Sequence, residues 1–486
     1  MPRPTLDRAV IRKLERAVGR EAVVWRPEEL IGFEYDGTIE KAQPQAVVLP
    51  TTAQQVADVV RIALDAGLPV VPRGAGTGLS GGAVAALGGV VVALTRMKRI
   101  IEVDPANRLA VVEPGVVNLD LSKAVDRHGL YYAPDPSSQR ACTLGGNVAE
   151  NAGGPHCLAY GVTTNHILGL EVVLPDGSIC WLGGRARETP GYDLRGVFVG
   201  SEGTLGIVTK IVVRLLRKPE ATRTLLAIFD EVDQASAAVS AIIGRGILPS
   251  AREMMDREII RAVEPALHVG YPLDAGAVLL IEVDGLREAV AEQALAVHEV
   301  CLATGAREVR EAEDAAERER LWAGRKGAIT AIGRIAPNYY VLDGVVPRTR
   351  LPYVLRQVYD TCARYGFPVA NVFHAGDGNL HPNILFDERH PGETARVLEV
   401  GAEIMRLCVD AGGSITGEHG IGYEKRSFME WIFSPADLDA MAKVKAAFGS
   451  NDLYNPCKLF PTGKGCGEVS QANIERVMAQ VPDAYI

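Results

Sequence analysis

The first 215 residues are dominated by short runs of apolar, often β-branched residues, each bounded by glycine or proline. Branched side chains pack well on a pleated sheet, so these runs predict buried strands. A helix is predicted over 52–66, with Thr51 or Thr52 as its cap and Gly67 at its end. The expected strands are 46–49, 69–71, 90–94, 109–112, 170–174 and 207–215. Another helix is expected at the N-terminus, where apolar residues recur at helical spacing: Leu6, Val10, Leu14, Ala17 and Val18.

The pattern changes near Pro219, after which longer helices rich in alanine, glutamate and arginine alternate with strands. This alternation is typical of a second domain in which helices cover a sheet. The fold class is therefore predicted to be α+β, with more than one domain. The expected helices are 234–243, 286–304, 311–322 and 436–448, and the expected strands include 278–283 and 338–342.

Charge and composition exclude several classes of protein. Among the 486 residues, 51 Lys+Arg stand against 60 Asp+Glu, and the net charge of -9 disfavours nucleic-acid binding. No apolar run reaches the roughly 18 residues of a membrane helix. The eight cysteines include no Cys-x-x-Cys pair, which favours a reducing compartment over a disulfide framework. We therefore expect a cytoplasmic protein without a transmembrane segment.

The segment 73–82, RGAGTGLSGG, is the first candidate binding site. It contains the dinucleotide pattern G-x-G-x-x-G at Gly76, Gly78 and Gly81, after a predicted strand. A Rossmann site requires that this pattern open a helix, and a βαβ crossover needs about ten residues or more. Only residues 83–87 precede the next glycines and strand. The segment is thus predicted to hold a phosphate-bearing cofactor in a loop, the alternative being a connection that binds nothing.

Two further glycine-rich segments follow, at 134–154 and 200–208. Each alone would be a weak signal, because glycine clusters are often only turns. Backbone N–H groups in such loops can surround an anionic ligand. Three of these loops within about 130 residues indicate a long ligand wrapped by loops.

A candidate metal site begins in the stretch 369–386, which is predicted to form a hairpin. If Asp377 and Gly378 are the turn residues, His374 pairs with His381 and their Cβ atoms lie about 5 Å apart. Asn383 shares the face of His381. Two such imidazoles suit one divalent ion, although two cross-strand histidines can also be structural.

A second element, 412–422, presents Glu418 and His419 between glycines. Two neutral histidines and one carboxylate leave coordination positions open, which is the pattern of a catalytic metal site. The remaining histidines lack such a setting and are interpreted as surface or core residues.

Together these motifs resemble the FAD-binding domain of the vanillyl-alcohol oxidase/p-cresol methylhydroxylase group. Within it, HAGDGNLHPN at 374–383 and GEHG at 417–420 resemble the D-2-hydroxyacid dehydrogenases, and 134–177 most resembles the flavin subunits of bacterial glycolate oxidases. The resemblance implies a FAD-binding domain of two α+β subdomains over 1–218. It also implies a cap domain over 219–445, with an antiparallel sheet covered by helices, and a segment, 446–486, that returns to the first domain.

The resemblance implies FAD as cofactor, with its pyrophosphate in the first glycine loop. Relatives that attach flavin covalently use a histidine in or near these loops; here the first loop has none and position 147 is Asn. The FAD is therefore expected to be non-covalent. The implied FAD contacts are Arg73, Gly74, Ala75, Gly76, Thr77, Gly78, Leu79, Ser80, Ser137, Thr143, Gly145, Gly146, Asn147, Ala152, Gly153, Gly154, Gly161, Glu202, Gly206, Ile207, Val208 and Asn455.

For the reaction itself, the resemblance implies that His374, His381 and Glu418 bind Zn²⁺ or Mn²⁺. It implies His419 as the general base. Arg325 is the candidate ligand for the substrate carboxylate, the alternative being a surface charge on a helix. Asn383 is a further candidate substrate contact.

The expected activity is metal-assisted oxidation of a small D-2-hydroxy acid, with hydride transfer to flavin N5 and electrons passed to a partner or quinone rather than NAD. Relatives that oxidise 2-hydroxyglutarate carry a lysine in a strand that here reads YYVLD, 339–343, which favours glycolate or D-lactate. A second departure is Cys457, where the family usually has glycine.

The implied partners are an iron–sulfur subunit and a second FAD-domain subunit, through which the chain would lie at the inner membrane. Three alternatives stay open. They are a self-sufficient D-lactate dehydrogenase with a quinone or cytochrome acceptor, a catalytically silent flavoprotein subunit, and a metal-dependent hydrolase.

Overall fold

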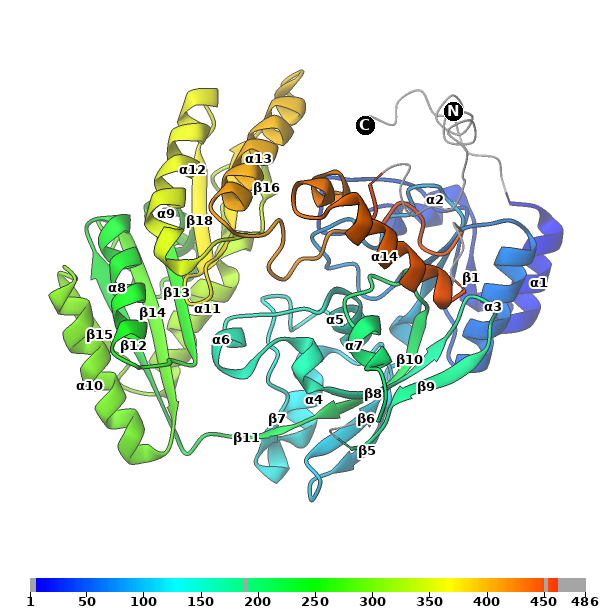
Figure 1. Ribbon diagram of the computed structural model, residues 1–486, viewed down its shortest axis with the longest axis horizontal. Coiled ribbons are helices and arrows are strands. Elements are labelled where there is room, and N and C mark those ends of the chain that lie inside the picture. Colours follow the sequence, from blue (N-terminus) through cyan, green and yellow to red (C-terminus); the bar gives the residue numbers. More distant parts are fainter. Residues whose placement is uncertain (1–5, 187–189, 450–452, 462–486) are drawn as a thin grey trace.

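The structure is a computed structural model that describes residues 6–186, 190–449 and 453–461. In Figure 1 the elements up to β11 lie on one side of the molecule and those from β12 to α13 on the other. We call these the first domain and the cap domain. The chain crosses between them from β11 (Leu216–Arg217) to β12 (Ala221–Phe229), and it returns after α13 (Glu393–Asp410).

A four-stranded sheet opens the first domain, with the strand order β1-β2-β4-β3. The last three strands are parallel, and α3 (Ala53–Asp65) makes the crossover from β2 to β3. Thr52 caps α3 by accepting from Gln55 N, which confirms one of the two predicted caps. The loop 74–89, all of it described, contains no helix, so the Rossmann interpretation is excluded as expected. The elements are α1 (Arg8–Val18), β1 (Val23–Val24), α2 (Pro27–Leu30), β2 (Ala46–Val48), β3 (Val70–Arg73) and β4 (Val90–Ala93).

A five-stranded antiparallel sheet completes the first domain, with the order β5-β6-β10-β8-β9. Apolar residues of this sheet, such as Ile211, pack against α4 and α5 through Leu121 and Val148. Because α5 starts directly after Thr143, this packing fixes the second glycine segment. The elements are β5 (Ile100–Asp104), β6 (Leu109–Val112), α4 (Asn118–Val125), β7 (Leu130–Tyr131), α5 (Leu144–Glu150), α6 (Cys157–Tyr160), β8 (Ile167–Val173), β9 (Ile179–Gly183), α7 (Leu194–Phe198) and β10 (Ile207–Arg214).

The cap domain is built on a larger sheet, in the order β15-β12-β14-β13-β18-β19-β17, to which β20 and β16 are added through β18. Its pairs are antiparallel. One core packs α8, α10, α12 and α13 on one face, and another packs α9 and α11 on the opposite face. The strands are β13 (Ala251–Asp256), β14 (Ala277–Gly285), β15 (Glu308–Glu311), β16 (Asn338–Val341), β17 (Gly344–Val345), β18 (Val369–His374), β19 (Asn379–Leu380) and β20 (Pro382–Phe386). The helices are α8 (Val232–Gly244), α9 (Arg257–Leu267), α10 (Arg287–Ala303), α11 (Ala315–Ile332) and α12 (Leu351–Tyr365).

The end of the described chain returns to the first domain after α14 (Pro435–Ala447). Val70 N donates to Leu453 O and Asn455 N donates to Val70 O, both at 2.7 Å, so this segment lies along the free edge of β3. Lys458 Nζ donates to Val84 O at 2.8 Å. The terminal helix expected after this loop lies outside the described residues.

The predicted strands and the helices over 52–66, 234–243, 286–304 and 436–448 are confirmed, with ends that differ by a few residues. The helix predicted over 311–322 is wrong at both ends. Glu311 belongs to β15, and Asp314 caps α11 by accepting from Glu317 N. The helix continues to Ile332 because Ala328, Ala331 and Ile332 pack into the second core of the cap.

The predicted register of the 369–386 hairpin is also wrong. His374 pairs with Asn379, and residues 375–378 form the turn. The register differs because β19 has a second pairing partner, β17. The strand is therefore interrupted at His381, between the end of β19 and the start of β20. The two histidine rings still meet, with centroids 5.2 Å apart and planes at 89°.

Candidate active site

A cavity of about 340 Å³ lies between the two domains. All three glycine-rich segments line it from the first domain, and Arg325, His374 and His381 line it from the cap. Glu418 and His419 line it from the segment that follows α13. Residues as far apart in the chain as Arg73 and His419 therefore share one wall, as the sequence motifs required.

Most of the residues predicted to contact FAD lie on this wall, and four do not. Ser80 is buried, and its carbonyl accepts from Tyr423 N. Asn455 Nδ2 donates to Glu202 O at 2.6 Å, so it holds the third glycine segment from behind. The lining residues are Arg73, Gly74, Ala75, Gly76, Thr77, Gly78, Leu79, Ser137, Thr143, Gly145, Gly146, Asn147, Ala152, Gly153, Glu202, Gly206, Ile207 and Val208, and the other two outside the lining are Gly154 and Gly161.

Several polar atoms on the cavity wall have no hydrogen-bond partner among the described residues. They include Arg73 Nη1, Thr143 Oγ1 and Ser201 Oγ, all buried. Leaving such groups unsatisfied costs about 1–3 kcal/mol each, so the wall fits a polar ligand that supplies the missing partners. This fits the phosphate, ribityl and ring oxygens of FAD.

The three candidate metal ligands converge from separate elements. His374 ends β18, His381 lies between β19 and β20, and Glu418 follows α13. Glu418 Oε1 lies 2.9 Å from His374 Nε2 and 3.2 Å from His381 Nε2. The three ligand atoms lie within 4.8 Å of one another. Burial alone would raise the pKa of Glu418, but the two imidazoles hold it well below its usual value. The set is compact enough for one divalent ion.

Two carboxylates that sequence reasoning missed orient these ligands. Glu253 on β13 accepts from His374 Nδ1 at 2.9 Å, which leaves Nε2 as the free ligand atom. Asp343 accepts from the backbone N–H of Gly417 and of His419, both at 3.0 Å, and so fixes the Glu418 loop. Neither carboxylate gave a clear local signal, because Glu253 has charged neighbours in β13 and Asp343 lies between β16 and β17, yet both are fully buried.

Glycine is required where the two domains meet at the metal ligands. A Cβ on Gly153 would lie 2.6 Å from Glu418 Oε2, and a Cβ on Gly420 would lie 2.3 Å from Glu150 Oε2. Gly420 also has φ +87°, a backbone conformation that glycine adopts at little cost. The second glycine segment therefore packs directly against the Glu418 loop.

His419 stacks on His381, with ring centroids 4.8 Å apart and planes at 5°. Its Nδ1 is buried and has no hydrogen-bond partner within the described part of the chain. Burial lowers the pKa of His419 to about 4, against the opposing effect of Asp343. The imidazole is therefore neutral at neutral pH and can accept a proton.

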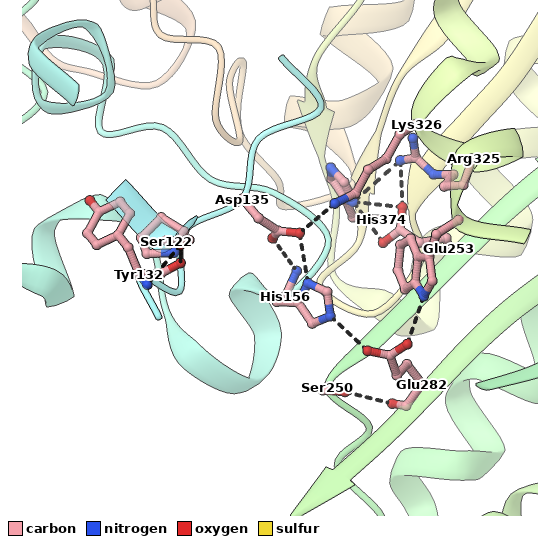
Figure 2. A network of polar contacts seen from close by, with 12 residues as sticks. Ser122, Tyr132, Asp135, His156, Ser250, Glu253, Glu282, Arg325, Lys326 and His374 are labelled. Atoms are coloured by element: carbon pink, nitrogen blue, oxygen red, sulfur yellow. Dashed lines mark hydrogen bonds and ion pairs between the residues drawn. The ribbon is translucent and has the colours of Figure 1, made fainter. Parts of the chain in front are cut away.

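Arg325 extends from α11 into the same wall and is only 2% exposed. Its Nη2 lies 2.5 Å from Glu253 Oε2, so Glu253 joins the guanidinium to His374 (Figure 2). Arg325 is thus a buried charge beside the metal ligands and is not on the protein surface. Asn383 is buried, donates to Ala370 O and His381 O, and is not among the lining residues.

Cys457 has φ +62°. A side chain in this left-handed region costs about 1–2 kcal/mol. We expect Cys457→Gly to raise the free energy of unfolding by about 0.5–1 kcal/mol, since glycine also gains entropy when unfolded. The denaturation midpoint checks this expectation. Cys457→Ala is the matched variant, because it keeps the β-carbon and should not gain stability. A lower midpoint for the glycine variant would contradict the strain argument.

Comparison with known proteins agrees with this geometry. Residues 44–183 match the FAD binding domain family, and residues 218–459 match the C-terminal domain of the FAD linked oxidases. The glycolate oxidase subunit GlcD of Escherichia coli K12 is 48% identical over 482 residues, which cover 99% of this chain and 97% of that protein. A D-lactate dehydrogenase of Anaerostipes hadrus is 34% identical, over 86% of this chain and 90% of its own length.

Solved structures show the same fold at low identity. p-Cresol methylhydroxylase with substrate bound superposes with a TM-score of 0.79 at 17% identity, over 94% of this chain and 98% of that chain. 4-Ethylphenol oxidase from Gulosibacter chungangensis gives a TM-score of 0.78 at 19% identity, over 95% and 99%. Within the described residues, none of the helices is long and apolar enough to cross a membrane. The fold and the nearly full-length sequence similarity place this chain in the family of FAD-linked oxidases.

Proposed function

We propose that this chain oxidises a small D-2-hydroxy acid, glycolate or D-lactate, to the 2-oxo acid, with non-covalent FAD and a divalent metal ion. The observation that carries the proposal is one shared cavity wall. It brings the glycine segments of a FAD-binding domain together with two histidines, a carboxylate, a neutral imidazole and a buried arginine. The relatives named as glycolate oxidase subunit and D-lactate dehydrogenase support the substrate class.

FAD and the metal ion would have distinct tasks. When bound, FAD supplies the acceptor of the α-hydrogen as hydride at N5, and the ion supplies a Lewis acid that lowers the pKa of the substrate hydroxyl. His374 Nε2, His381 Nε2 and Glu418 would hold the ion. Two nitrogen ligands and one carboxylate suit Zn²⁺ and do not exclude Mn²⁺.

The residues of this chain orient the substrate and move its proton. The Arg325 guanidinium binds the substrate carboxylate through a bidentate fork, and Glu253 holds the guanidinium in place. His419 accepts the hydroxyl proton, for which its unpartnered Nδ1 is available.

The substrate is proposed to carry a single carboxylate. Lys326 also lines the cavity, but its Nζ lies 3.2 Å from Asp135 Oδ2, so its charge is already compensated. Arg325 is also paired, with Glu253, but its Nε is buried without a hydrogen-bond partner among the described residues and remains a donor for one carboxylate. A second carboxylate would have no free cation here, which favours glycolate or D-lactate over a dicarboxylate.

The electron acceptor and the location are proposals of the same kind. We propose that electrons leave through an iron–sulfur subunit, alongside a second FAD-domain subunit, and that the chain is cytoplasmic and reaches the inner membrane through them. The relative named as a glycolate oxidase subunit supports this. A self-sufficient D-lactate dehydrogenase is the second candidate, supported by the D-lactate dehydrogenase relative. The complete metal and base set argues against a silent subunit, and membership of a FAD-linked oxidase family argues against a hydrolase.

Anaerobic absorption spectroscopy with a panel of 2-hydroxy acids tests the proposal. We expect glycolate and D-lactate to bleach the flavin, and L-lactate and D-2-hydroxyglutarate to act at least about a hundredfold more slowly, because Arg325 and the metal ligands fix both carboxylate and hydroxyl. Steady-state rates with an artificial dye then separate the two candidates by their preference for glycolate or D-lactate. Flavin that none of these acids reduces would refute the proposed substrate class.

A further inference from the structure

His156, which immediately precedes α6 in the first domain, lies between two carboxylates. Its Nδ1 is 2.9 Å from Asp135 Oδ2, and its Nε2 is 3.3 Å from Glu282 Oε1 on β14 of the cap (Figure 2). An ionised carboxylate accepts hydrogen bonds and donates none. Both ring nitrogens of His156 must therefore carry hydrogen. His156 is therefore an imidazolium that joins one carboxylate of each domain.

The charges around His156 support this protonation state. Burial alone would lower the pKa of His156, but Asp135 and Glu282 raise it to about 10. Lys326 and Arg318 also face these carboxylates, at 3.2 and 2.8 Å. His156, its two carboxylates and these two cations consequently form a largely buried network of opposite charges, in contrast to an exposed surface ion pair.

Glu282 fixes the cap side of this network. Its carboxylate accepts from Trp322 Nε1 at 2.7 Å, from Thr224 Oγ1 at 2.7 Å and from Arg318 at 2.8 Å. The Trp322 ring also stacks on the His156 ring, with centroids 5.4 Å apart and planes at 29°. The cap residue that contacts His156 is thus held from several directions.

One face of α11 carries the network into the active site. Arg318, Trp322 and Lys326 are spaced four residues apart, so they share a face of the helix. Lys326 pairs with Asp135, and the adjacent Arg325 pairs with Glu253 beside His374. We call Asp135, His156, Glu282, Trp322 and Lys326 the interdomain clamp.

We propose that His156 is a positioning residue, which through the interdomain clamp sets the distance between the second glycine segment and Arg325. The segment 134–154 lines the cavity from the first domain, and α11 lines it from the cap. The clamp joins these two parts of the cavity wall directly, at the point where Asp135 precedes the lining residues Pro136 and Ser137. The expected effect of the clamp on the rate of flavin reduction rests on the proposed function, whereas the contact between the domains does not.

Loss of the clamp should lower the rate of the chemical step more than it lowers substrate binding. A displacement of about 1 Å between reacting groups costs about a hundredfold in rate, because hydride transfer needs close alignment. Arg325 would keep its contact with Glu253 and so continue to bind a carboxylate. We therefore expect a fall in the limiting rate with a nearly unchanged dissociation constant for substrate.

The test uses His156→Phe, Glu282→Gln and the double variant of the full chain. Phenylalanine keeps a ring to stack on Trp322 and removes both hydrogen bonds. His128→Phe, on an exposed histidine of the same domain, is the matched control. Stopped-flow reduction of bound flavin by glycolate and by D-lactate gives the limiting rate and the dissociation constant. Flavin content and the rate of proteolysis in the linker at 218–220 are measured alongside.

We expect each single variant to reduce flavin at least tenfold more slowly with full flavin content, and the double variant to be no slower than the slower single one. Two residues that act through one contact are non-additive in this way. Wild-type limiting rates in both single variants, or independent multiplicative losses, would overturn the proposal. So would slow reduction that is wholly explained by lost flavin.

The linker measurement keeps the proposal testable if no hydroxy acid reduces the wild-type flavin. In that case the proposed function fails, but the clamp still predicts faster linker cleavage in both single variants and no further increase in the double variant. Cleavage at the wild-type rate in both would overturn the clamp independently of the substrate.

Discussion

Replacing Glu418 by glutamine is expected to slow substrate-driven flavin reduction by about a thousandfold, which corresponds to about 4 kcal/mol of lost stabilisation. Glutamine keeps the shape of the side chain and removes the charge that lies 2.9 Å from His374 Nε2. The site then offers two neutral imidazoles and no anion, so it should hold a divalent cation weakly. Metal content per chain, flavin absorbance and the reduction rate are measured on the same sample.

Glu388→Gln is the matched control, because Glu388 is an exposed carboxylate that follows β20 and lies away from the cavity. Removal of the metal by a chelator should reproduce the loss in the wild-type protein, and added Zn²⁺ or Mn²⁺ should restore it. Full activity in chelator-treated, metal-free protein would refute the Lewis-acid role while leaving FAD binding untouched.

His419→Gln is expected to slow the same reduction by about 10²–10⁴-fold while metal and flavin stay bound, because a positioned general base contributes about that much. Glutamine cannot accept the hydroxyl proton. His419 is outside the proposed ligand set of His374, His381 and Glu418, although it forms a second possible ligand set with Asp343 and His381. The single-turnover loss of the oxidised flavin absorbance measures the effect.

His390→Gln serves as its control, since His390 is exposed and pairs only locally with Glu393, at 3.3 Å. A reduction rate near the wild-type value in His419→Gln would assign the proton to another acceptor. Loss of metal in this variant would instead show that His419 supports His381, on which it stacks.

Much of the fold could be predicted from local pattern. The capped helix at 53–65 and the β-branched runs were recognisable because each signal lies within a few residues of the structure it produces. The register of the 369–386 hairpin was not recognisable, since β17, some 35 residues earlier, pairs with β19 and redirects the chain at His381. The register therefore depends on pairing with a neighbouring strand, and the turn length alone could not predict that register.

The candidate site divides in the same way. His374 and His381 were identifiable from their cross-strand placement in the predicted hairpin, and Glu418 and His419 because they stand between glycines, an arrangement that is costly without a ligand. Glu253 was not, because one of several charged residues in 251–256 acquires its meaning only when β13 pairs with β18 and brings it opposite His374. His156 was interpreted as a surface or core histidine for the same reason: both of its carboxylates arrive from distant segments.

The return of residues 453–455 to the edge of β3 has a consequence for biosynthesis. During translation the first sheet must wait, with one strand edge open, until the ribosome has made the entire cap. At about 5–20 residues per second this interval is tens of seconds. An open edge is a template for wrong pairing with another nascent chain, so this family member should depend on chaperones that shield the edge until the final segment emerges.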